Sequence, residues 1–121
     1  MTATASPTSY YGARNAYLDE FTISERYEDL MASARNDPTA RMVVHFVDAI
    51  VRADEDIIRL GREITDRIER VAAKVASRQH IATLGELQRT PVEYDQACTA
   101  RQTAIENLRH VAAAYREAHT T

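Results

Sequence analysis

The sequence has few of the residues that interrupt helices or cross-link chains. It contains three glycines, three prolines, one cysteine and no tryptophan among 121 residues. The single cysteine, Cys98, excludes an internal disulfide and is consistent with a reducing cytoplasm. Scarce glycine and proline favour helices, and no stretch alternates β-branched or aromatic with polar residues as a strand would. We therefore expect an all-α protein.

Long apolar runs and a strong net charge are also missing. No stretch approaches the roughly 20 apolar residues that span a bilayer. Met1 to Ser9 has neither the charged nor the apolar region of a signal peptide. The net charge is −3, which argues against nucleic-acid binding by bulk electrostatics. These absences predict a cytoplasmic protein that makes no contact with a membrane.

Helical periodicity divides the chain into a tail and one domain. Residues 1–9 have no periodic pattern and predict a disordered tail. Residues 10–121 predict a single helical domain, with helices at about 23–35, 38–79 and 91–118.

Capping signals mark the starts of these helices. Thr22 with Glu25, and Thr90 with Glu93, match the capping box in which two side chains satisfy each other's end amides. Asp37 precedes Pro38, and such a pair predicts an N-cap followed by a proline in the first turn, where its missing N–H costs nothing.

Apolar residues recur in steps of three and four on the two longer helices, as in helices that pack along one face. The predicted seam on the longest helix comprises Val43, Val47, Ile50, Asp54, Ile57, Gly61, Ile64, Ile68 and Val71. The matching seam on the last helix comprises Tyr94, Arg101, Ile105, Leu108 and Tyr115. Matched seams with a short connection predict an antiparallel helical hairpin beside a shorter N-terminal helix.

The length of the central helix predicts self-association. A helix over residues 38–79 is roughly 60 Å long, whereas a compact domain of this size has a radius of gyration of about 14 Å. Such a rod has about one partner helix at each level, so part of its apolar edge stays open. We expect two hairpins to form a homodimer that completes a four-helix-type bundle. The alternative is a compact monomer whose long helix is bent or broken at Gly61.

Two charged residues lie on the otherwise apolar seams. A charge at Asp54 or Arg101 costs stability but can fix register or oligomeric state. On that basis, Asp54→Leu is expected to raise the melting temperature and alter the oligomer. The alternative is that the seam opens to water at these levels.

The patterns that carry enzyme chemistry are missing. His45 with Asp48 and Glu106 with His110 are each spaced to give two metal ligands, but no Glu-x-x-His or His-Glu-x-x-His motif occurs. Cys98 on an apolar seam is typical of a small buried hydrophobe. No glycine-rich phosphate loop is present. We predict no enzyme activity, no cofactor and no metal.

A nucleic-acid-associated regulator is the alternative function. Residues 83–97 have the short helix, turn and longer helix of a helix-turn-helix, and the helices within 83–118 could present an arginine stripe. That stripe would comprise Arg78, Arg89, Arg101, Arg109 and Arg116. Glu93 and Asp95 argue against it, because they would face phosphate with the wrong sign.

The favoured function is a non-enzymatic helical module for protein–protein interaction or assembly, such as an adaptor or a small regulatory accessory protein. Its candidate partner-contacting residues are Tyr10, Tyr11, Tyr17 and Phe21, since tyrosine supplies large contact area at low entropic cost. The alternative for these aromatic residues is that they fold back and close one end of the bundle, which we favour slightly.

Overall fold

The computed structural model describes residues 10–78 and 85–120, with side chains described from Thr90 onward in the second segment. Within these residues it contains four helices and no strand. The helices are α1 (Gly12–Glu20), α2 (Tyr27–Ser33), α3 (Pro38–Ala76) and α4 (Gly85–Ala118). The predicted all-α class is confirmed. The predicted tail at residues 1–9 lies outside the described residues.

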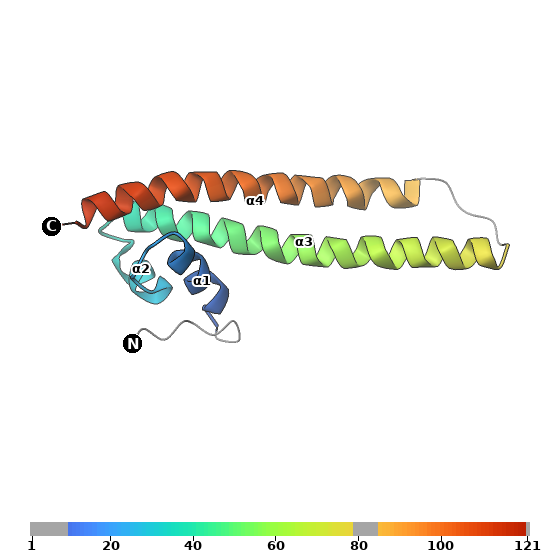
Figure 1. The fold of residues 1–121 in the computed structure, drawn as a ribbon, viewed down its shortest axis with the longest axis horizontal. Coiled ribbons are helices and arrows are strands. Elements are labelled where there is room, and N and C mark those ends of the chain that lie inside the picture. Colours follow the sequence, from blue (N-terminus) through green and yellow to red (C-terminus); the bar gives the residue numbers. More distant parts are fainter. Residues whose placement is uncertain (1–9, 79–84, 121) are drawn as a thin grey trace.

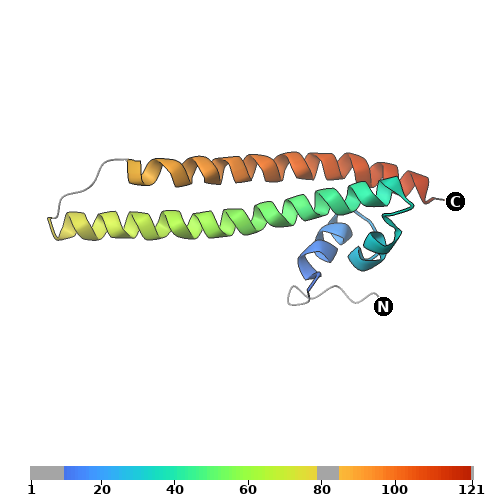
Figure 2. The ribbon, with the colours of Figure 1, turned by 180° about the vertical axis from the view of Figure 1, so that it is seen from behind.

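Helices α3 and α4 form an elongated antiparallel hairpin, with α1 and α2 packed beside the first half of α3 (Figure 1). Seen from behind, both short helices still lie at the end of the hairpin that holds the C-terminus (Figure 2). We call this the proximal end. The other end consists of α3 and α4 alone, and α3 extends past the start of α4 (Figure 1). The predicted hairpin is confirmed.

Helix α3 is continuous over 39 residues. Asp37 caps it as predicted, because its side chain accepts hydrogen bonds from the backbone amides of Thr39 and Ala40, and Pro38 is the first helical residue. The alternative of a break at Gly61 is wrong, since the helix passes through this residue to Ala76.

Two predicted helix starts are wrong. Thr22 lies outside any helix with φ of 62°, and the helix that follows begins at Tyr27. Thr90 lies inside α4, which begins at Gly85 and contains Pro91. Helix α1 was not predicted from the sequence. It lies between the aromatic residues Tyr11 and Phe21 and contains Tyr17.

The buried core lies at the proximal end, where four helices meet. Its members are Leu18, Ile23, Tyr27, Leu30, Ala40, Val43, Val47, Ile50, Ala104, Leu108, Val111, Ala112 and Tyr115. These residues come from both short helices, the turn between them, the first third of α3 and the end of α4. The far half of the hairpin contributes nothing to this cluster.

Candidate interaction surface

The two charged seam residues pair with each other across the hairpin. Arg101 Nε donates to Asp54 Oδ1 at 2.5 Å. The Tyr17 hydroxyl, from α1, donates to Asp54 Oδ2, and Arg101 Nη2 donates to the Tyr17 hydroxyl oxygen at 3.0 Å. We call these three residues the Asp54 cluster. It ties α1, α3 and α4 together at the point where the proximal core ends.

The hydrogen bonds of the Asp54 cluster have a structural role, because they join three helices. Burial raises the pKa of the Tyr17 hydroxyl, and its hydrogen bond to Asp54 raises that pKa further. The hydrogen bonds to Tyr17 and Asp54 likewise raise the pKa of Arg101. The Tyr17 hydroxyl therefore stays protonated and Arg101 stays charged near neutral pH, so both remain donors to Asp54.

A second carboxylate on α3 holds the short helices. Arg14 Nε and the Tyr27 hydroxyl both donate to Asp48 Oδ1 at 2.7 Å. The Arg14 guanidinium also lies over the Tyr27 ring, 5.4 Å from its centroid. Burial, followed by the hydrogen bond to Asp48, raises the pKa of Tyr27 to about 12. His45 and Asp48, whose spacing alone would suit two metal ligands, lie in different surroundings, because the carboxylate is bonded within the fold while His45 is exposed.

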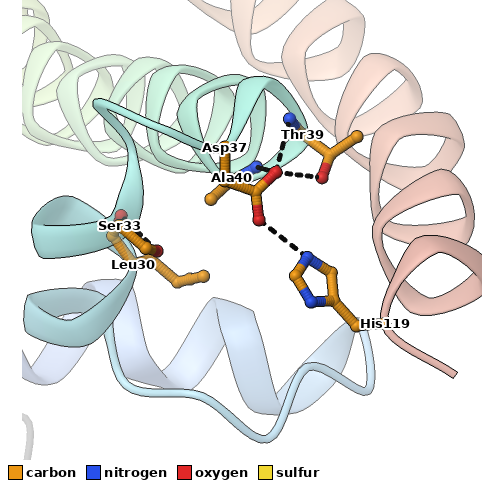
Figure 3. Close-up of polar contacts among 6 residues, drawn as sticks. All are labelled: Leu30, Ser33, Asp37, Thr39, Ala40 and His119. Atoms are coloured by element: carbon orange, nitrogen blue, oxygen red, sulfur yellow. Dashed lines mark hydrogen bonds and ion pairs between the residues drawn. The ribbon is translucent and has the colours of Figure 1, made fainter. Parts of the chain in front are cut away.

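Two polar contacts hold the C-terminal end of α4 against the N-terminal part of the chain. His119, just after α4, places Nε2 2.7 Å from Asp37 Oδ2, on the side of the carboxylate away from the capped amides (Figure 3). Arg116 Nη1 donates to the backbone oxygen of Phe21 at 2.5 Å. Phe21 lies directly after α1 and Asp37 caps α3, so these contacts join the end of α4 to the segment after α1 and to the start of α3.

The predicted aromatic contact residues divide into two groups. Tyr11, Tyr17 and Phe21 are half-buried and pack against the core cluster. Tyr10 is 86% exposed. Three of the four side chains therefore pack within the fold, whereas Tyr10 is mostly exposed and its ring contacts Tyr11 edge-on, with 4.6 Å between the centroids.

The far half of the hairpin has almost no buried residues. We define the distal arm as residues 57–76 of α3 together with the part of α4 that lies beside them. Within 57–76 only Leu60 is buried, at 3% exposure. Ile58, Ile68 and Val75 are large apolar residues with more than half of their surface exposed. The arm therefore presents apolar surface that the described residues do not cover.

Five exposed residues and one half-buried glycine form one face of α3. The exposed residues are Ile58, Thr65, Ile68, Ala72 and Val75. Gly61 continues their steps of three and four but is half-buried beside the Tyr94 ring of α4. We call these six residues the distal stripe. The stripe lies in register with Val47, Val51 and Asp54, on the side where α1 binds Asp54. The same face is thus covered at the proximal end and open beyond Asp54.

The predicted seams follow this division. Buried members are Val43, Val47, Ile50, Leu108 and Tyr115; half-buried members are Asp54, Ile57, Gly61, Ile64, Val71, Tyr94, Arg101 and Ile105; Ile68 is exposed. The sequence prediction missed Ala53 and Leu60, which are buried at 5% and 3% exposure. These two residues are seven apart, and this heptad spacing was the signal that could have identified them. Because both are buried, α4 covers a face of α3 that is rotated toward them and leaves the other edge of the predicted seam open.

The candidate metal-ligand residues and Cys98 are not gathered into one cluster among the described residues. This part of the chain contains no group of three or more His, Cys, Asp or Glu side chains that would hold a metal ion. Cys98 is unbridged and lines an open groove beside Ile57 and Arg101. The predicted pair of Glu106 and His110 lies exposed on the outer face of α4.

Two arginines of the alternative stripe have partners within the fold. Arg101 is bonded to Asp54, and Arg116 to Phe21, whereas Arg78 and Arg109 are exposed. The side chain of Arg89 and the start of the predicted helix-turn-helix lie outside the described residues. Two of the five arginines therefore have structural partners.

Among the described helices, none combines the length and the apolar character needed to cross a membrane. Comparisons of the chain with protein-family models, with curated proteins and with solved structures found no match.

Proposed function

We propose that this chain is a non-enzymatic helical module for protein–protein assembly, and that it acts as a homodimer through the distal arm. The observation that carries the proposal is the distal stripe, because a folded chain rarely leaves a sustained apolar face in water without a partner. A two-helix arm gives each helix one neighbour, whereas a bundle of four would cover this face. The unbridged Cys98 suits action in a reducing compartment such as the cytoplasm.

The mass of the chain in solution tests this proposal. Light scattering over a range of concentrations should give the mass of a dimer at the upper end for the wild-type chain. Ile68→Glu places a charge on the distal stripe and should shift the mass toward the monomer. Met42→Glu is the matched control, because Met42 is also exposed on α3 but lies near the proximal end. A wild-type chain that stays monomeric at every concentration would contradict the proposal.

Nucleic acid and a different protein are the alternative partners. A gel shift at two salt concentrations separates the first, since phosphate contacts would give tight and strongly salt-dependent binding. For the second, the isolated chain would be monomeric, and Ile68→Glu would abolish capture of the other protein. Either result would replace the homodimer as the function of this surface.

A further inference from the structure

We infer that the distal stripes of two copies pack against each other in an antiparallel arrangement with a two-fold axis between Asp66 and Arg67. This inference rests on the proposed function and specifies the geometry of the dimer. It follows from the residues that flank the distal stripe, which are different on its two sides.

One flank of the stripe is charged and the other is apolar. Arg62 and Glu69 each follow a stripe residue by one position and are exposed. Neither forms an ion pair within the part of the chain that the structure describes, where Arg59 instead pairs with Asp56 and Glu63. The opposite flank carries Ile57, Ile64 and Val71, which are half-buried beside α4.

The direction of packing follows from these flanks. In an antiparallel pair of helices each flank lies against the same flank of the other helix, whereas in a parallel pair it lies against the opposite flank. Antiparallel packing therefore places Arg62 and Glu69 opposite the charged flank of the second copy. Parallel packing would place both charges against isoleucine and would leave them without an opposite charge.

The register follows from the signs of the two charges. With the axis between Asp66 and Arg67, each Arg62 lies opposite the partner's Glu69, and the two-fold symmetry makes this ion pair twice. A slip of one heptad in one direction places Arg62 opposite its own copy in the partner. A slip in the other direction places Glu69 opposite its own copy. Like charges would oppose both slips.

The apolar layers of this register are complementary in size. Ile58 lies level with the partner's Val75, and Thr65 with the partner's Ile68. Gly61 lies level with the partner's Ala72, so this layer consists of small residues. The Tyr94 ring of α4 borders it, with Cε2 3.7 Å from the position that a Cβ on Gly61 would take. Each layer occurs twice through the two-fold axis, which gives six layers over the length of the distal stripe.

The one hydroxyl on the distal stripe is compatible with burial in such an interface. Thr65 Oγ1 donates to the backbone oxygen of Gly61 at 3.0 Å, one turn earlier on α3. Its donor is satisfied within the helix, so covering it leaves no unpaired N–H or O–H at the interface. Its methyl group contributes to the apolar layer.

The size of the distal arm indicates a reversible dimer. The stripe runs about 26 Å along α3, and a two-helix face is about 20 Å across. The footprint of about 500 Å² per copy is below the ~800 Å² per partner of a standard interface. A dissociation constant in the micromolar range is therefore expected, which makes the effect of single charges measurable.

Charge exchange at positions 62 and 69 tests the geometry. Arg62→Glu and Glu69→Arg each create two like-charge contacts and should raise the dissociation constant of the homodimer about tenfold at low salt, as two altered ion pairs imply. The double variant restores opposite charges and should return to within about threefold of wild type. An equimolar mixture of the two single variants should form a heterodimer at least as tight as the wild-type dimer. Sedimentation velocity measures all four samples.

Arg70→Glu is the matched control, because it makes the same charge change on an exposed residue of α3 outside the stripe and its flanks. It should leave the dissociation constant within about threefold of wild type. A wild-type dimer that is insensitive to the exchange, or single variants that fail to pair on mixing, would overturn the antiparallel geometry and leave the proposed dimer standing. A monomeric wild-type chain would overturn both.

Discussion

Thr22 holds the turn between α1 and α2 in a backbone conformation that β-branched residues rarely adopt. Its φ is 62°. Its amide donates to Asp19 O at 3.1 Å and the Ile23 amide donates to Leu18 O at 2.8 Å, which are the two bonds of a Schellman motif. Leu18 and Ile23 are both buried. The apolar pair that closes this motif therefore stabilises a turn whose left-handed residue is unfavourable.

Thr22→Gly should stabilise the protein. Glycine adopts the left-handed region without a steric cost, so the free energy of unfolding should rise by about 1 kcal/mol. Urea unfolding followed by circular dichroism measures the change. Ser24→Gly is the control, since Ser24 is exposed and has no positive φ; there glycine only adds entropy to the unfolded chain, and stability should fall. Equal losses for both variants would contradict strain at Thr22.

The cap at Asp37 should depend on pH. Its hydrogen bond from Thr39, together with those from Ala40 and His119, lowers the pKa of Asp37 below its ordinary value. A carboxylate whose pKa is lowered by folding contributes stability above its unfolded pKa near 4, and this stability is lost as pH falls through the folded value.

Removing this cap should therefore cost most at neutral pH. Asp37→Ala should lower the free energy of unfolding by about 1 kcal/mol at pH 7, and the difference from wild type should shrink as the pH falls below about 4. Thermal unfolding at a series of pH values measures this. Asp37→Asn keeps a capping oxygen without a titrating charge, so its cap should not respond to pH. A constant deficit for Asp37→Ala across this range would exclude a role for the ionised carboxylate.

At the scale of the helices, the Asp54 cluster reverses an expectation from the sequence. Read as an unpaired seam charge, Asp54 predicts that Asp54→Leu is stabilising. The structure pairs it with Tyr17 and Arg101, so leucine would leave both donors without their acceptor at a site that is partly buried. We now expect Asp54→Leu to lower the free energy of unfolding by about 1 kcal/mol. This is the lower end of the cost of an unsatisfied buried donor, because the site is partly hydrated.

A double-mutant cycle separates the pair from its surroundings. Arg101→Leu alone should also destabilise, and Asp54→Leu with Arg101→Leu should cost less than the sum of the two, because a buried apolar pair replaces a broken ionic one. Chemical unfolding of the four proteins gives the coupling energy. Strict additivity would mean that Asp54 and Arg101 stabilise the hairpin independently.

The hairpin could be predicted from the sequence because its signal is long and local. Val43, Val47 and Ile50 continue a spacing that persists over many turns, and Asp37 with Pro38 marks its start without ambiguity. Helix α1 could not be predicted, since it is stabilised by contacts with distant residues such as Asp48 and Asp54. A helix of nine residues is marginal without tertiary packing.

The failed predictions of helix starts have physical causes. A capping box requires its first residue to have extended backbone, whereas Thr22 is the left-handed residue that ends α1. Thr90 is 3% exposed within α4, and the helix extends back past it to Gly85 alongside α3. The open face of the distal arm likewise could not be read from the seams alone, because the sequence does not specify how far α4 is rotated around α3.

At the scale of the whole molecule, the two ends of the hairpin differ in how many helices cover α3. The proximal end is closed by α1 and α2, and the distal arm has α4 alone (Figure 1). Local stability follows buried apolar contact, so the core cluster should be the last region to open and the distal arm the first. Dimerisation through the distal stripe would reduce this difference.

Truncation of residues 1–21 tests whether the aromatic segment closes the proximal end or serves a partner. It removes Leu18, which is fully buried, and Tyr17, which bonds Asp54. Loss of one buried leucine side chain alone costs about 2–5 kcal/mol, so the melting temperature should fall steeply. Tyr10→Ala is the control, because a ring that is 86% exposed contributes little to stability. A truncated chain that melts at the wild-type temperature would show that α1 does not stabilise the fold.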